Sequence, residues 1–78
     1  MRRYYKNMLR ELRRNKGISQ SELANLMDVN QRTISTWEIG RSIPKPYQMR
    51  FLAEFYKTPI EQIFFEAFNY KNELKLSI

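Results

Sequence analysis

The sequence predicts an all-α fold of five short helices in one small domain. Three observations favour this fold. Apolar residues recur at the spacing of one helix face in five successive segments. Cap residues, glycine or proline mark most ends of these segments. A chain of 78 residues has room for a single hydrophobic core. We expect residues 1–66 to form the domain and residues 67–78 to form a C-terminal tail.

The first helix is indicated by an apolar stripe near the N-terminus. Tyr5, Met8, Leu9 and Leu12 follow one another at the i, i+3, i+4, i+7 spacing. Gly17 is expected to end this helix in the left-handed conformation. At 100° per residue, a second face of the same helix collects basic side chains: Arg3, Lys6, Arg10, Arg13 and Arg14.

Two short helices separated by a tight turn are predicted next, over residues 20–27 and 31–38. Ser19 and Glu22 have the spacing of a capping box at the start of the first. Asp28 tolerates the left-handed conformation that the turn needs, and Asn30 can cap the second helix. The apolar residues that face the core are Leu23, Ala24, Met27, Ile34 and Trp37.

A loop and two more helices complete the domain. Gly40 closes the third helix, and two prolines make residues 41–46 a loop, with Pro46 at the first position of a fourth helix. Thr58, Pro59 and Glu61 give a cap, an N1 proline and a capping-box acid for a fifth helix that runs to about residue 66. The expected core residues here are Met49, Leu52, Ala53, Tyr56, Ile60, Ile63 and Phe64.

The tail has more apolar bulk than a solvated surface segment needs. Leu74, Leu76 and Ile78 alternate as in a strand, and Phe65, Phe68 and Tyr70 precede them. Five short helices should bury their apolar faces against one another. The tail is therefore expected either to form a dimer contact or to pack on its own core.

Composition excludes several function classes. The chain has no cysteine and no histidine, which removes thiolate and imidazole metal sites and the commonest catalytic base. The acids are scattered and no glycine-rich phosphate loop is present, so we expect no enzyme, no cofactor, no metal and no small-molecule substrate. No apolar run reaches the length of a membrane span, and MRRYYKNML lacks the apolar run of a signal peptide. A small domain without cysteine fits the cytoplasm.

The positive charge is concentrated at the N-terminus. The net charge is +6, and residues 1–16 carry seven basic groups against one acid. Residues 17–45 balance at three against three, and residues 46–78 at four against four. A one-sided basic face is explained by a polyanionic partner, although a merely solvated face would have the same composition.

From about Leu9 to Phe64 the chain resembles the Cro and phage-repressor type of helix-turn-helix regulator, the XRE family. The most specific pieces are ISQSELA at 18–24, TISTWE at 33–38 and the early Arg13. The resemblance implies a phage-repressor-like domain with the helix-turn-helix at helices 2–3, sequence-specific binding of double-stranded DNA and a homodimer. It also implies that a basic residue at Arg13 pairs with the acid at Glu38, so these two are interpreted as a structural ion pair.

In a helix-turn-helix the second helix of the motif enters the major groove. Arg32 can bind guanine and Gln31 can bind adenine, each through two hydrogen bonds. The expected base-reading residues are Gln31, Arg32, Ser35 and Thr36. The expected phosphate contacts come from the start of each motif helix, the following loop and the first helix: Gln20, Asn30, Thr33, Arg41, Ser42, Lys45, Lys6 and Arg10.

Three positions depart from the family pattern. Asp28 replaces the usual turn glycine, Ile39 replaces a frequent asparagine, and Leu26 takes a position that is normally polar and so should be exposed. The leading hypothesis is a small Cro-like repressor of phage or prophage type that binds an inverted repeat as a dimer. The alternative is a protein-interaction module on the same fold, such as an antitoxin or an antagonist of another regulator.

Overall fold

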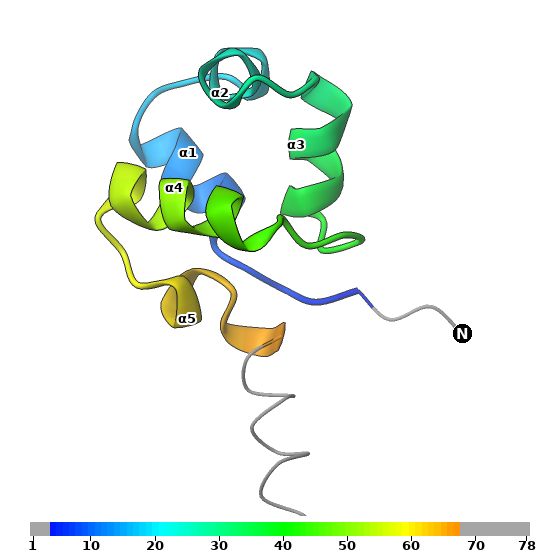
Figure 1. Ribbon diagram of the computed structural model, residues 1–78, viewed down its shortest axis with the longest axis vertical. Coiled ribbons are helices and arrows are strands. Elements are labelled where there is room, and N and C mark those ends of the chain that lie inside the picture. The colour runs from blue at the N-terminus through cyan, green and yellow to red at the C-terminus, as the bar shows by residue number, and fades with distance from the viewer. Residues whose placement is uncertain (1–3, 68–78) are drawn as a thin grey trace, which may run out of the picture.

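The computed structural model describes residues 4–67 and confirms the all-α fold (Figure 1). Residues 65–67 are again helical after a turn at Phe64, and no strand occurs between residues 4 and 67. The five helices are α1 (Leu9–Asn15), α2 (Gln20–Met27), α3 (Gln31–Glu38), α4 (Pro46–Tyr56) and α5 (Ile60–Ile63).

Each helix contributes one nearly inaccessible residue to a shared core. Leu9, Leu23, Ile34, Leu52 and Ile63 come from α1 to α5 in turn, and each is at most 2% exposed. In Figure 1, α2 and α3 form one side of the domain, α4 crosses in front of α1, and α5 lies beyond α4. The core therefore ties α2 and α3 to the rest of the fold and fixes how α3 is presented.

The turn between α2 and α3 has the predicted chemistry. The Ser19 hydroxyl accepts from the Glu22 N–H, and the Glu22 carboxylate accepts from the Ser19 N–H, which completes the capping box. Asp28 ends α2 in the left-handed conformation at φ 57°. Asn30 caps α3 by accepting from the Thr33 N–H. These predictions are confirmed, and both motif helices have the expected bounds.

The first helix begins later than its apolar stripe predicted. Residues 4–7 are not helical, so Tyr5 and Lys6 lie outside α1. The Asn7 side chain accepts from the Leu9 N–H and so acts as a start signal that the sequence analysis missed. The reason for the early break is tertiary: the Tyr5 N–H donates to the Gly40 carbonyl at 3.2 Å, and the Met8 N–H donates to the Ile63 carbonyl at 2.9 Å. These bonds hold the segment between the end of α3 and α5.

The start of α5 also differs from its prediction. Pro59 occupies the cap position rather than the first helical position, and the Thr58 hydroxyl donates to the Tyr56 carbonyl instead of capping the helix. The Thr58 N–H donates to the Ala53 carbonyl at the end of α4. Thr58 therefore finishes α4, and α5 is a single turn that ends at Ile63 rather than near residue 66.

The fourth helix begins with Pro46 at its first position, as predicted. The Gln48 side chain accepts from the Lys45 N–H and completes the start of the helix. At the other end Lys57 adopts the left-handed conformation at φ 52°, which no glycine had signalled. Leu26 is 56% exposed, as expected from its position.

The predicted strand pattern at residues 74–78, with Phe68 and Tyr70, lies outside the described residues. Ala67, the last described residue, is buried at 7% exposure. Within residues 4–67 no helix is long and apolar enough to cross a membrane.

Candidate nucleic-acid interface

The third helix has a buried side and a polar side. Ile34 and Trp37 are buried in the core at 1% and 4% exposure. Gln31 and Arg32, in the first turn, are exposed. Ser35 and Thr36, one turn further along, are half-buried. The exposed edge of α3 is thus formed by the first two residues of the helix, with Ser35 and Thr36 set deeper.

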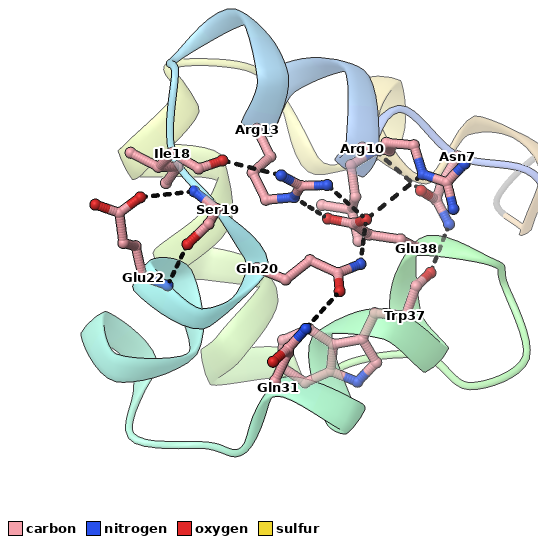
Figure 2. A network of polar contacts seen from close by, with 11 residues as sticks. Asn7, Arg10, Arg13, Ile18, Ser19, Gln20, Glu22, Gln31, Trp37 and Glu38 are labelled. Atoms are coloured by element: carbon pink, nitrogen blue, oxygen red, sulfur yellow. Dashed lines mark hydrogen bonds and ion pairs between the residues drawn. The ribbon is translucent and has the colours of Figure 1, made fainter.

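Behind this edge, Glu38 is the centre of a buried polar network (Figure 2). Its side chain is inaccessible and accepts from Arg13 through two bonds, Nε to Oε2 at 2.6 Å and Nη2 to Oε1 at 3.3 Å. The Arg13 Nη1 atom also donates to the Ile18 carbonyl at 2.9 Å. Arg10 approaches Glu38 at 3.7 Å but is half exposed. The hydrogen bond from Arg13 to Glu38 raises the pKa of the guanidinium further above its already high ordinary value.

From Glu38 the network continues outward to the exposed edge of α3. The Gln20 Nε2 group donates to Glu38 Oε1 at 3.0 Å. The Gln20 Oε1 atom then accepts from Gln31 Nε2 at 3.3 Å, and Gln31 Oε1 accepts from the Ser21 hydroxyl at 3.0 Å. Figure 2 shows Gln20 between Glu38 and Gln31. A buried carboxylate in α3 is therefore connected through α2 to a side chain at the first position of α3.

This network determines which way each amide faces. A carboxylate can only accept, so Gln20 must turn its NH₂ group toward Glu38 and its oxygen toward Gln31. Gln31 must then turn its NH₂ group toward Gln20 and its oxygen toward Ser21. One N–H and one lone pair of the Gln31 amide stay unused, because an amide has two donors and two acceptor sites. This remaining N–H group and lone pair match the acceptor and the donor that an adenine edge presents in the major groove.

The other expected base-reading residues differ in their surroundings. Arg32 is exposed and forms no hydrogen bond or ion pair within residues 4–67, so its five donors have no partner in that part of the chain. Thr36, by contrast, donates to the Thr33 carbonyl at 2.8 Å and accepts from the Ser42 hydroxyl at 3.1 Å. Its hydroxyl thus connects α3 to the following loop.

The expected phosphate contacts fall into separate groups. At the start of α3 the Asn30 side chain accepts hydrogen bonds from the N–H and the hydroxyl of Thr33. Arg41, Ser42 and Lys45 are exposed in the loop between α3 and α4. Gln20 directs its amide nitrogen inward to Glu38. The two residues expected on the first helix are separated in the structure, because Arg10 lies on α1 while Lys6 lies in the segment before it.

Two residues that support this face were not identified from the sequence. Ser21 holds the Gln31 amide, and Asn7 donates to the Trp37 carbonyl at 2.9 Å, which ties the N-terminal segment to the end of α3. Ser21 carries no local signal, because its partner is ten residues away. Asn7 does precede an apolar helix and could have been recognised as a cap.

Comparisons with known proteins agree with this architecture. A family model described as helix-turn-helix matches residues 9–63. The chain is 27% identical over 59 residues to the HTH-type transcriptional activator BcrR of Enterococcus faecalis. The aligned part is 76% of this chain but only 29% of that relative. No solved structure gives a significant match.

Proposed function

Because the chain belongs to the helix-turn-helix family, of the Cro and phage-repressor type, we propose that it is a sequence-specific DNA-binding transcription regulator. In this proposal α3 enters the major groove of double-stranded DNA. Gln31 and Arg32 make the base contacts, with Ser35 and Thr36 beside them. The relative from Enterococcus faecalis is described as a transcriptional activator, which supports the regulatory part of the proposal.

The observation that carries the proposal is the orientation of the Gln31 amide by Gln20 and Ser21. A side chain held in one rotamer loses less entropy when it binds. Its donor and acceptor also point in fixed directions, which suit only a base edge with the matching pattern. Adjacent to it, Arg32 offers an unpaired guanidinium of the kind that binds guanine. An oriented amide and an unpaired guanidinium at the same helix start are a suitable pair for reading two neighbouring base pairs.

Phosphate contacts in this proposal come from both sides of α3. Arg41, Ser42 and Lys45 bind from the loop, Gln20 acts through the N–H groups at the start of α2, and Asn30 and Thr33 act at the start of α3. Lys6 and Arg10 add charge from the N-terminal side. Contacts of this kind position the protein on the duplex but carry no sequence information.

We further propose that the protein binds an inverted repeat as a homodimer. One short helix reads too few base pairs for useful specificity, and two half-sites about one helical turn apart solve this problem. The α5 side of the molecule offers a contact surface. It has an open apolar hollow of about 570 Å³, whose lining includes Ile43, Pro44, Ile60 and Ala67. Ile43 and Phe65 are also exposed, at 41% and 38%. Residues 67–78 follow this surface in the chain and are proposed to contribute to it.

A small domain that covers its operator can repress by occupying the promoter, which is the action proposed for this protein, in the manner of a phage or prophage Cro-like repressor. Selection of bound sites from random duplexes, followed by footprinting of the enriched site, tests the proposal. We expect a protected region with two-fold symmetry. A single asymmetric half-site occupied by one molecule at saturation would contradict the dimer, and the absence of any enriched site would contradict sequence-specific binding.

The interaction-module alternative predicts a different outcome of the same assay. An antitoxin or antagonist that works through protein contact alone would show no enrichment. The affinity of a DNA-binding protein must instead fall steeply as salt rises, because bound phosphates release counterions.

A further inference from the structure

The outer side of α4 carries an aromatic stripe that the proposed DNA interface does not use. Tyr47, Phe51 and Phe55 follow one another at four-residue spacing along the helix. Tyr47 is 64% exposed and Phe51 is 36% exposed. Phe55 is half-buried against the core, and its ring stacks on that of Phe51 with centroids 5.6 Å apart. With Leu26 of α2, which is 56% exposed, these three residues form what we call the α2–α4 surface.

The α2–α4 surface is hollowed between its two helices. A groove of about 170 Å³ lies there, lined by Leu26, Met27 and Asp28 from the end of α2 and by Tyr47, Gln48 and Phe51 from α4. Large apolar side chains gathered around a groove, with polar groups at its rim, are typical of a protein contact. A stripe that advances by eight residues along a helix is about 12 Å long, which matches two or three turns of a partner helix.

The two ends of this stripe carry opposite charges. Asp28 lines the groove beside Tyr47 and Phe51, at the end where α4 begins. At the other end the Lys16 ammonium group lies 4.9 Å from the centroid of the Phe55 ring. Within residues 4–67 neither Asp28 nor Lys16 forms an ion pair.

We propose that the α2–α4 surface binds the same surface of a second copy of this chain about a two-fold axis near Phe51. In such a contact every residue pair occurs twice, except a pair of identical residues at the axis, which occurs once. Phe51 meets Phe51 of the other copy, and Tyr47 of each copy meets Phe55 of the other. The same rotation brings the Asp28 end of each copy to the Lys16 end of the other. The surface is thus complementary to itself in charge, with apolar side chains between its two charged ends.

This contact is distinct from the dimer surface proposed on the α5 side. The hollow on the α5 side is lined by Pro46, Met49 and Arg50 of α4, whereas the groove is lined by Tyr47, Gln48 and Phe51. One molecule can therefore use both sides of α4 at once. On DNA the α2–α4 contact would join dimers on neighbouring operators and make their binding cooperative; this role, unlike the contact itself, rests on the proposed function.

Reciprocal charge reversal in the full-length protein tests the contact without DNA. In Lys16→Glu both end pairs become acid against acid, and in Asp28→Lys both become base against base. Because the α5 side is proposed to form the dimer, the α2–α4 contact is measured as association beyond the dimer. Each variant alone should show this association about tenfold more weakly than the wild type in sedimentation experiments. An equimolar mixture should recover the association. In the mixed pair the introduced carboxylate of one variant faces the introduced ammonium group of the other, and the native Asp28 of the first faces the native Lys16 of the second.

Each result of this experiment decides the proposal. Unchanged association of the single variants, or a mixture no better than its components, would overturn the contact. Thermal melting shows whether the variants fold; Lys57 already occupies a left-handed cap, so lysine at position 28 has a precedent in this chain. Since the chain has no cysteine, Phe51→Cys gives a second readout. It should form a disulfide-linked pair on oxidation, whereas a cysteine at the exposed Glu11 of α1, which lies on neither proposed contact surface, should not. Equal linking of Phe51→Cys and Glu11→Cys would count against an axis near Phe51.

A DNA experiment separates this proposal from the proposed function. Wild-type protein on a tandem pair of its selected sites should bind with positive cooperativity, and Lys16→Glu should lose that cooperativity. If the wild type binds no DNA at all, the proposed function fails, and sedimentation still decides whether the α2–α4 contact exists.

Discussion

At the scale of the residue, Glu38 is the charge on which the exposed side of α3, the proposed DNA-reading side, depends. Its side chain has no access to solvent and accepts three hydrogen bonds, two from Arg13 and one from Gln20. A buried carboxylate without its partners is costly, because it has lost its hydration and gains nothing in return. The same group sets the orientation of Gln20 and, through it, of Gln31.

We expect removal of either partner of the buried ion pair to destabilise the fold strongly. Glu38→Ala or Arg13→Ala should lower the free energy of unfolding by roughly 3–5 kcal/mol. The first leaves the guanidinium donors of Arg13 without their acceptor, and the second leaves the buried carboxylate of Glu38 without its opposite charge. The double variant should lose less than the sum of the two. Urea unfolding measures all three, with Arg10→Ala as the exposed control, which should change by less than about 1 kcal/mol. Additive losses below about 1 kcal/mol for the pair would contradict its buried role.

Arg32 and Lys45 should have separable effects on DNA binding. Arg32→Ala should cost roughly 1–3 kcal/mol and relax specificity at one base position. Lys45→Ala should weaken all duplexes alike and flatten the salt dependence by about one unit of slope. Titrations on the selected site and on random DNA at several salt concentrations distinguish the two. Equal losses on both duplexes for Arg32→Ala would exclude base reading by that residue.

The buried hydroxyl of Tyr56 predicts a loss of stability at high pH. It is buried without a hydrogen-bond partner in the described part of the chain. Burial, and then the negative charge of Glu38, raises its pKa from 10.0 to about 12. The folded protein therefore disfavours the phenolate. Between pH 10 and about 12 the tyrosine of the unfolded chain ionises and the buried one does not. The free energy of unfolding therefore falls as the pH rises through this range.

Tyr56→Phe isolates this effect, because every other titrating group is retained. Between about pH 9 and about pH 12 the wild type should lose more of its free energy of unfolding than the variant does. Near neutral pH the variant should be at least as stable as the wild type, because it removes an unsatisfied buried donor. Parallel curves for the two proteins across this range would show that the hydroxyl is solvated.

At the scale of the element, Gly17 and Gly40 end α1 and α3 in the same backbone conformation but in different surroundings. Gly17 has φ 74° and nothing within 4 Å of the position of an added Cβ. Gly40 has φ 82°, and an added Cβ would overlap the carbonyl group of Tyr5. Gly40 is therefore needed both for its conformation and for the close approach of the N-terminal segment.

Alanine at these two glycines should give unequal losses of stability. Gly17→Ala should cost about 1–2 kcal/mol, the strain of a left-handed alanine. Gly40→Ala should cost more, and it should also detach the segment around Tyr5. Thermal melting measures the first effect, and limited proteolysis near residue 5 measures the second. Equal melting temperatures for the two variants would mean that the segment moves aside without cost.

At the scale of the whole molecule, the surface on the α5 side is the one proposed to join two molecules on one operator. A chain truncated after Ala67 should stay folded, because each core residue from α1 to α5 is retained, but it should dimerise weakly. Its operator affinity should fall steeply, since the second half-site contributes through its linkage to the first. Sedimentation and melting together decide the outcome. A truncated chain that dimerises normally yet melts many degrees lower would show that the tail belongs to the core.

The sequence by itself determined the helices α2, α3 and α4 and the turn between α2 and α3. Their signals are local: Ser19 with Glu22, Asp28, Asn30 and Pro46 each act on backbone groups within a few residues. Such interactions are the same in almost any tertiary context, so composition and spacing were enough. The family resemblance and the pairing of Arg13 with Glu38 also followed from residues present in the sequence.

Only the tertiary structure decided where α1 begins and how the exposed side of α3 is held. The start of α1 depends on Gly40 and Ile63, which are more than thirty residues from Tyr5 and Met8 in the chain. The orientation of Gln31 depends on Gln20 and Ser21 in another helix. Hydrogen bonds between distant segments exist only once the core has packed, and no local pattern of residues contains them.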